Sequence, residues 1–148
     1  MSDNRQLCTF YLHDLFFGVD VVEVQEVIRA QKTTRVPLAA PAVNGLINLR
    51  GQIVTALDLR IQLGLPPRAD GEVPMNVVVR TPEGPVSLLV DRIGDVIEIS
   101  EDLFAPLPET VDERMREVVD GVYKIKDRLL LALKTDVVTQ ISDTGAAA

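Results

Sequence analysis

Few residues in this sequence have the side-chain chemistry that catalysis needs. His13 is the only histidine and Cys8 is the only cysteine. A nucleophilic pair would need both side chains on one side of a strand. Positions 8 and 13 differ by an odd number, so in a regular strand they face opposite ways. We interpret His13, at the end of an expected strand, as a surface turn residue.

The carboxylates do not suggest an acid–base pair or a metal site either. Asp91, Asp95 and Glu98 lie close together along the chain, but no convergent partner accompanies them, and solvated strand ends explain them. A glycine-rich phosphate loop, a nucleophile elbow and a zinc-binding HExxH motif are all missing from the sequence. We therefore predict a protein that is not an enzyme and that binds no cofactor or metal.

Arg50 is the charged residue with the most distinctive surroundings. Two apolar runs, Leu46–Leu49 and Ile53–Leu57, flank the tripeptide Arg50-Gly51-Gln52. This pattern is typical of a β-hairpin in which glycine takes the positive φ of the turn. The hairpin is otherwise uncharged, so the turn exposes a single cation. That cation is either a contact for a partner or simply a solvated turn residue.

The residues after this hairpin read as the start of a short helix. Asp58 occupies a natural N-cap position, and Gly64 ends the helix before Pro66 and Pro67. Arg60 then reads as a charge on the helix surface. Both Asp58 and Arg60 thus have a structural explanation alongside any functional one.

The strand–turn–strand unit occurs twice in the chain. A shift of 76 positions places residues 44–57 on residues 120–133, and a shift of 69 places 8–28 on 77–97. The identities are few, but the apolar and turn positions coincide. If the repeat is real, the chain is a duplicated small β-unit and not one sheet.

Length and composition agree with one small domain, or with two small barrels that share a core. The chain has 148 residues, of which 47% are hydrophobic, and its net charge is −7 with a pI near 4.7. An anionic membrane surface or a nucleic acid backbone would be repelled overall. Tryptophan is absent and aromatic residues make up 4%, which argues against a base-stacking platform.

Compartment signals point to the cytoplasm. A single cysteine excludes an internal disulfide and suits a reducing compartment. The polar start MSDNRQ has no apolar segment after it, and no apolar run approaches the roughly 18 residues of a membrane span. We expect a cytoplasmic protein that does not insert into a membrane.

Secondary structure outside the main hairpin is also suggested by pattern. Val21–Ile28 is rich in valine and is expected to be a strand with an irregular turn near 20–23. A short helix is expected within Val111–Val118, opened by Thr110 or Asp112. The segment Pro66–Pro74, PPRADGEVP, is the strongest linker candidate.

From this linker we derive an expected division of a single domain that spans residues 1–148. Barrel one should cover about 14–70 and barrel two about 75–142. The strand at 7–13 could pair with either barrel, and 143–148 should form a loose tail.

Several motifs together resemble the CheW family of bacterial chemotaxis coupling proteins. They are FFGVDVVEVQEVI at 16–28, VNGLINLRGQIVTALDLR at 43–60 and LLVDRIGDVIEI at 88–99. The prolines 106 and 108 and the pair Gly121-Val122 agree as well, so the resemblance covers about 7–141. One departure is Thr55, where the family's strand usually carries proline, and it raises a question about local strand geometry.

The resemblance implies an all-β fold of two interlocked, five-stranded, SH3-like β-barrels with a third hydrophobic core between them. It also implies a non-catalytic adaptor that couples the cytoplasmic tips of methyl-accepting chemotaxis receptors to the regulatory domain of a CheA-type histidine kinase. The adaptor would be a monomer alone and part of a receptor array in the cell. A pair of small barrels that binds single-stranded nucleic acid is the alternative, but it would need a basic face bearing aromatic residues.

The resemblance also assigns candidate site residues. The family's receptor-facing groove lies between the barrels, and its motif positions are Val24, Glu26, Gly45 and Arg50. Kinase contacts lie on the barrel ends, which places them only loosely, around Asp58, Arg60, Ala105 and Leu107.

Overall fold

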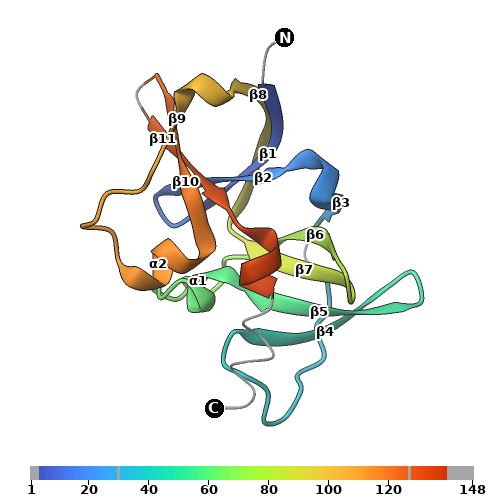
Figure 1. Ribbon diagram of the computed structural model, residues 1–148. Helices are drawn as coiled ribbons and strands as arrows, with labels where there is room; N and C mark the ends of the chain where they lie inside the picture. The colour runs from blue at the N-terminus through green and yellow to red at the C-terminus, as the bar shows by residue number, and fades with distance from the viewer. Residues whose placement is uncertain (1–3, 30, 127, 140–148) are drawn as a thin grey trace.

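The computed structural model describes residues 4–29, 31–126 and 128–139, and the expected tail at 143–148 lies outside them. Eleven strands and four short helical segments are named in this part of the chain (Figure 1). The strands are β1 (Asn4–Leu12), β2 (Leu15–Asp20), β3 (Val24–Ile28), β4 (Val43–Leu49), β5 (Gln52–Asp58), β6 (Met75–Thr81), β7 (Gly84–Val90), β8 (Arg92–Ser100), β9 (Phe104–Ala105), β10 (Val119–Ile125) and β11 (Arg128–Leu133). The helical segments are η1 (Val21–Glu23), α1 (Leu59–Gln62), η2 (Glu101–Leu103) and α2 (Glu113–Val118), and a further helical turn covers 135–139.

Local sequence signals account for the helical segments. Asp58 caps α1 by accepting a hydrogen bond from the Arg60 N–H, and Asp112 caps α2 in the same way through the Arg114 N–H. The irregular turn expected near 20–23 is the 3₁₀ segment η1, which leads directly into β3. These three predictions are confirmed.

The internal repeat is confirmed by the strand registers. In the β4–β5 hairpin Gly45 pairs with Ala56, and in the β10–β11 hairpin the equivalent Gly121 pairs with Ala132. Both hairpins carry a register shift directly before this glycine. The β1–β2 and β6–β7 hairpins match in the same way at the shift of 69, and the parallel pairs β2–β11 and β5–β7 correspond to each other.

The two sheets do not follow the expected division of the chain. One sheet has the order β3-β6-β7-β5-β4, and we call it barrel one. The other has the order β8-β1-β2-β11-β10-β9, and we call it barrel two. β2 at 15–20 therefore lies in barrel two, whereas β6 and β7 at 75–90 lie in barrel one, so the boundaries 14–70 and 75–142 do not describe the sheets. Each repeat places its first hairpin in the sheet completed by the other repeat, because β3 pairs with β6 and β8 pairs with β1.

Each sheet closes through an equivalent contact. In barrel two, β8 at one edge continues through the three residues of η2 into β9, which pairs with β10 at the other edge. In barrel one, the chain after β3 reaches the opposite edge, where Thr34 pairs with Leu46 of β4. A curved strand that spans both edges is what turns each sheet into a small barrel.

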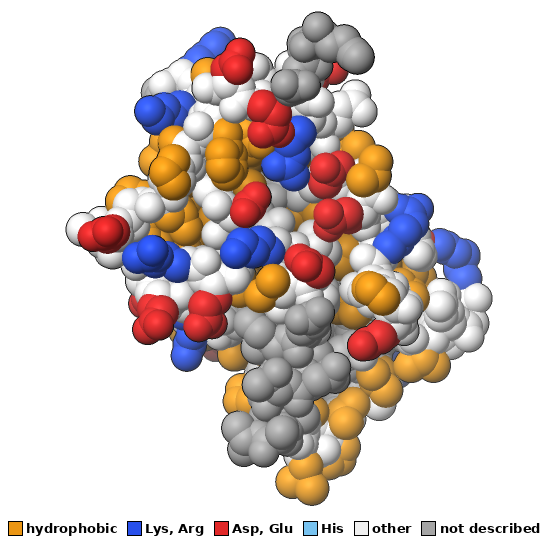
Figure 2. All heavy atoms as spheres, viewed as in Figure 1, with side chains coloured by type: hydrophobic (Ala, Val, Ile, Leu, Met, Phe, Trp, Pro, Cys, Tyr) orange, Lys and Arg blue, Asp and Glu red, His pale blue; other side chains and the backbone are white. Residues whose placement is uncertain are grey.

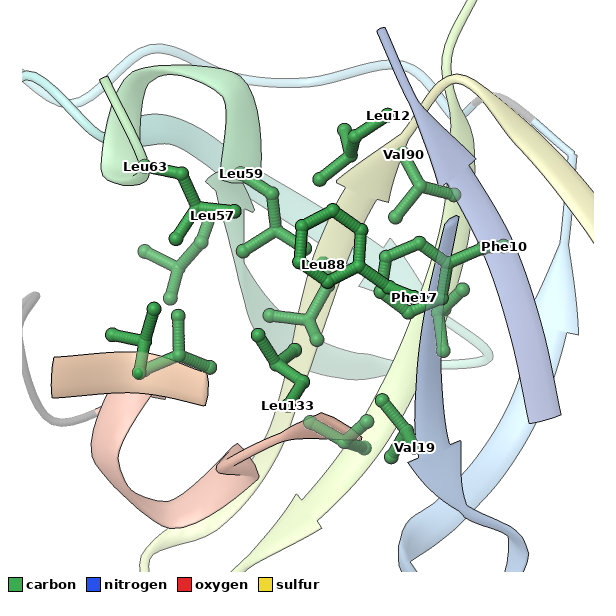
Figure 3. Packing of buried hydrophobic residues seen from close by; sticks show 14 of the residues in the cluster. Phe10, Leu12, Phe17, Val19, Leu57, Leu59, Leu63, Leu88, Val90 and Leu133 are labelled. Carbon is green, nitrogen blue, oxygen red and sulfur yellow. The ribbon is translucent and has the colours of Figure 1, made fainter. Parts of the chain in front are cut away.

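The buried residues form three hydrophobic cores. One core lies within barrel one around Val54 and Val78, and another lies within barrel two around Leu130 and Tyr123. The third and largest draws on both barrels, and Figure 3 shows Phe10 and Phe17 of barrel two packed beside Leu57 and Leu88 of barrel one. The stacked rings of Phe10 and Phe17, 5.6 Å apart, lie fully buried in it. The all-β fold with two interlocked barrels and a shared core is therefore confirmed.

Candidate functional site

The turn between β4 and β5 presents Arg50 to solvent. Leu49 pairs with Gln52, so the loop contains only Arg50 and Gly51, and both have positive φ values, 52° and 90°. Two positive values define the type I′ turn that matches the twist of a two-residue hairpin. The sequence assigned the positive φ to Gly51 alone, but the structure extends it to Arg50. The Asn48 side chain accepts a hydrogen bond of 2.8 Å from the Gly51 N–H and holds the turn.

Arg50 forms a bidentate ion pair with Glu26 of β3. Its Nη1 donates to Glu26 Oε1 at 2.9 Å, and its Nη2 donates to Glu26 Oε2. Hydrogen bonds from Arg50 are the main reason that the pKa of the Glu26 carboxyl is lowered. The Arg50 side chain remains 69% exposed, whereas that of Glu26 is 20% exposed. The pair links two edge strands of barrel one at the surface, with the cation outermost.

Val24 lies at the junction between the barrels. It is the first residue of β3, directly after η1 carries the chain from barrel two into barrel one. Its half-buried side chain packs against the shared core. The Arg80 guanidinium donates to the Val24 and Val22 carbonyl oxygens at 2.9 and 3.0 Å, which secures the start of the strand. Val22 itself is 73% exposed, so an apolar surface borders Val24.

Gly45 is buried and has a structural role that the sequence did not reveal. Its φ is 153°, and a Cβ there would lie 2.4 Å from the Thr34 carbonyl oxygen. That oxygen belongs to the strand segment that closes barrel one. Of the four residues expected to face the receptor, the structure therefore joins Glu26 and Arg50 directly, places Val24 on the same strand as Glu26, and puts Gly45 beneath the surface.

A shallow cleft of about 290 Å³ begins beside the Arg50 turn. It is lined by Gln52 and Ile53, by the β6–β7 turn at 81–86, and by Asp136 of the last helical turn. Thr55 lines it too and pairs regularly with Leu46 and Val86, so the residue that replaces the family's usual proline leaves the strand geometry intact.

Asp58 and Arg60, two of the expected kinase contacts, belong to an internal ion network. The Arg60 side chain is only 9% exposed, and it donates to the Asp91 carboxylate at 3.0 and 2.5 Å and to the Pro66 carbonyl oxygen at 2.9 Å. Arg68 donates to Asp91 at 3.0 Å and lies 3.6 Å from the Asp58 carboxylate. These bonds hold the 66–74 linker against the body of the protein. Arg60 is thus not the helix-surface charge that its position suggested.

Asp91 is the acceptor at the centre of this network. Burial raises the pKa of its carboxyl, but hydrogen bonds from Arg60, the His13 backbone N–H and Arg68 outweigh burial and lower the pKa to about 2. From the sequence, Asp91 was interpreted as a solvated strand end, and Arg68 had no predicted role. No local signal could have paired them, because the partners are separated by 23 and 31 positions and meet only in the folded chain.

Ala105 and Leu107 lie on the opposite barrel from Arg50. Ala105 is half-buried in β9 and pairs with Val122, while Leu107 packs against the shared core. The chain continues from here to α2, whose Arg114 guanidinium lies against Gly64 just after α1. α1 and α2 lie on the same side of the molecule (Figure 1).

The described residues hold no cluster of three or more potential metal-binding side chains. Cys8 is buried, and burial raises the pKa of its thiol, which keeps it protonated and unreactive. Figure 2 shows acidic and basic side chains interspersed over the visible face, without a continuous basic stripe. No helix in the described ranges is long and apolar enough to cross a membrane.

Two interlocked SH3-like barrels with a shared core and an exposed arginine turn define a structural class of small β-proteins. The family model for the CheW-like domain matches residues 6–142, and the chain belongs to this family. It is 28% identical over 147 residues to the chemotaxis protein CheW of Bacillus subtilis. The alignment covers 99% of this chain and 94% of that protein. It is 26% identical over 144 residues to the probable chemotaxis protein CheW of Rhizobium etli, with 97% and 93% coverage.

A solved structure agrees with the sequence comparisons. The scaffolding protein TtCheW from Thermoanaerobacter tengcongensis superposes with a TM-score of 0.81 at 27% identity, over 93% of this chain and 92% of the other. The family and the fold together identify a chemotaxis coupling adaptor, and they do not favour a nucleic-acid-binding module.

Proposed function

We propose that this protein binds the cytoplasmic tip of methyl-accepting chemotaxis receptors and the regulatory domain of a CheA-type histidine kinase at the same time. The observation that supports it most is the Arg50–Glu26 pair, held on a rigid turn beside the junction of the barrels in a CheW-like chain. The protein would act in the cytoplasm at membrane-associated receptor arrays, as a monomer when free.

The geometry of the pair suits recognition of a receptor helix. Glu26 fixes the guanidinium, so little side-chain freedom is lost on binding, and the exposed side of Arg50 can still donate to a partner. Val24 and the exposed Val22 add an apolar surface next to it. Arginine is among the residue types enriched in binding hot spots. In this proposal Gly45 acts indirectly, because it lets the closing segment pass beneath β4.

The kinase surface is proposed at Ala105 and Leu107 on the end of barrel two. Ala105 lies in the two-residue edge strand β9, a position from which one barrel can dock on another. Asp58 and Arg60 would support a kinase contact only indirectly, by stabilising the structure under the surface. Arg60 is buried, and its nitrogens are bonded within the protein. Modest apolar contacts of this kind suit a reversible assembly.

A crossed experiment tests both surfaces. Affinities of Arg50→Ala and Ala105→Glu would be measured by isothermal titration against an isolated receptor tip and an isolated kinase regulatory domain. We expect Arg50→Ala to weaken receptor binding by roughly thirtyfold or more and to leave kinase binding unchanged. Ala105→Glu should show the reverse pattern, because it introduces a charge into an apolar contact.

Lys126→Ala is the matched control, since Lys126 occupies the equivalent turn of barrel two with a similar positive φ of 43°. It should leave receptor binding intact. Equal small losses from Arg50→Ala and Lys126→Ala would show that Arg50 is an ordinary surface residue. Absence of kinase binding at millimolar concentrations would show that the partner is wrong.

A further inference from the structure

Barrel two carries an aromatic–cation patch made of Tyr11, Phe16, Arg92, Lys126 and Arg128. The rings of Tyr11 and Phe16, which pair across β1 and β2, lie 4.9 Å apart. The Arg92 guanidinium lies 4.6 Å over the Tyr11 ring, and the Arg128 guanidinium lies 4.9 Å over the Phe16 ring. Arg128 also donates to the Tyr11 hydroxyl at 2.9 Å. The two guanidinium groups are thus held in place by rings.

A cavity of about 330 Å³ opens at this patch. Its wall contains both rings, Lys126 and Arg128, together with the apolar side chains of Ile97 and Ile125. Thr9 and the exposed carboxylate of Asp95 complete the lining. The cavity therefore combines apolar side chains with two cations, in a chain whose net charge is −7.

The internal repeat allows these cations to be compared with the charges of barrel one. Lys126 is the equivalent of Arg50, and Asp95 is the equivalent of Glu26. In barrel one the two residues form a bidentate pair. In barrel two, within the ranges that the structure describes, Arg92, Lys126 and Arg128 have no carboxylate within ion-pair distance. Among the described residues, the ion pair that neutralises Arg50 in barrel one has no counterpart between Lys126 and Asp95 in barrel two.

We propose that the aromatic–cation patch binds an acidic segment of a partner protein in which a carboxylate stands next to an apolar side chain. The carboxylate would accept hydrogen bonds from Arg128 and Lys126, and the neighbouring apolar side chain would enter the cavity against Ile97 and Ile125. Stacking on the rings orients the guanidinium groups before binding, which lowers the entropic cost of recognition.

The patch is a poorer match for single-stranded nucleic acid, although it combines rings with cations. A guanidinium already lies over each ring, so the rings are less accessible to stacking bases. Asp95 lines the cavity and would repel a phosphate. The three cations also form one cluster and not a track that could follow a phosphate backbone.

This surface is separate from both surfaces of the proposed function. The Arg50 turn belongs to barrel one. Ala105 pairs with Val122 in β10, whereas the patch lies beyond the end of that strand, where Ile125 pairs with Arg128. The inference therefore does not depend on receptor or kinase binding.

The test is a titration of the full-length, ¹⁵N-labelled protein with a short peptide of alternating glutamate and leucine, followed by NMR. We expect the largest shifts at the amides of Tyr11, Phe16 and Arg128. The matched peptide with glutamine in place of glutamate should bind at least about tenfold more weakly, as should Arg128→Gln and Lys126→Gln with the original peptide. Arg116→Gln, an exposed arginine on α2, is the control and should bind normally.

Several results would overturn the proposal. Equal binding of the glutamine peptide would show that the patch does not recognise a carboxylate. Shifts centred on Arg50 would place the binding site elsewhere. Tighter binding of a short oligothymidylate at the same amides would assign the patch to nucleic acid. If the shifts of these amides depended on the concentration of the protein alone, the patch would bind a second copy of this chain. Unchanged receptor and kinase affinities of Arg128→Gln would confirm that the surface is independent.

Discussion

At the scale of single residues, two arginines near each other in sequence show how exposure separates roles. Arg50 and Arg60 each form a bidentate pair with one carboxylate. The Arg50 side chain is 69% exposed and the Arg60 side chain is 9% exposed. An exposed ion pair contributes little to stability, and its outer face stays accessible to partners. Removing one member of a buried ion pair strongly destabilises the protein.

The buried network should make stability depend on acid pH. The pKa of the Asp91 carboxyl falls from an ordinary value of 3.8 to about 2 in the folded protein. A lowered pKa stabilises the fold fully above the unfolded value, and this contribution is lost as the pH falls from about 4 to about 2. The shift in pKa corresponds to about 2 kcal/mol of stability. We expect the free energy of unfolding, measured with urea, to fall by this amount between about pH 4 and pH 2.

Asp91→Asn tests the assignment of that pH dependence. We expect it to lower the free energy of unfolding at pH 7 by about 3 to 5 kcal/mol, because the guanidinium groups of Arg60 and Arg68 stay buried without their carboxylate. The variant should also lose most of the decline between pH 4 and 2. Asp95→Asn, at an exposed position of β8, should stay within about 0.5 kcal/mol of wild type. An unchanged acid profile in Asp91→Asn would assign the decline to other carboxylates.

At the scale of elements, the two repeats use the same device to close each barrel. Gly45 and Gly121 each follow the register shift of a hairpin and lie where the closing segment passes. A Cβ at Gly121 would lie 2.4 Å from the Phe104 ring and 2.7 Å from the Ala105 carbonyl oxygen. The close approach of backbone to backbone, and not a turn, is what requires glycine at both positions.

Alanine at either position should therefore destabilise the protein. For Gly45→Ala and Gly121→Ala we expect a loss of about 2 to 3 kcal/mol in the free energy of unfolding, because the closing segment must move. Gly71→Ala is the control: its φ is positive, 90°, like that of Gly45, but no atom lies within 4 Å of the added Cβ. It should lose only about 1 kcal/mol from backbone strain. Losses equal to the control would show that the closing segments move freely.

At the scale of the whole molecule, the repeats are interlocked and not placed side by side. β1 and β2 complete the sheet of the second repeat, and β6 and β7 complete that of the first. The shared core takes residues from both barrels, so neither has an independent interior (Figure 3). The linker at 66–74 connects the repeats in sequence but does not separate two folding units.

This arrangement predicts that the halves depend on each other. Fragments 1–70 and 71–148, expressed separately, should each lack a cooperative thermal transition, because each lacks strands of its own sheet. Mixing them should restore the β-type circular dichroism spectrum and a cooperative transition. Protease should cut first within 66–74 or in the tails, and the nicked product should elute from gel filtration as one species. A cooperative transition in either fragment alone would contradict the interlocked fold.

Local features were predictable because they depend on neighbours in the chain. The hairpin turn at Arg50, the caps at Asp58 and Asp112 and the break at η1 all follow from a few adjacent residue types. The repeat was visible because the apolar periodicity of each strand persists even where identities are few. Composition and the missing motifs argued against catalysis, and the family resemblance supplied the barrels and the candidate site residues.

Only the tertiary structure decided which strands share a sheet and which charges meet. An extended segment with valine on both faces, such as β6, can pair with several others, and the observed pairing buries Val77 and Val79 in the shared core. Arg60, Arg68 and Asp91 look like solvated charges in the sequence, and their burial depends on contacts across 23 and 31 positions. Periodicity records which face of a strand is buried, but long-range packing determines against what it is buried.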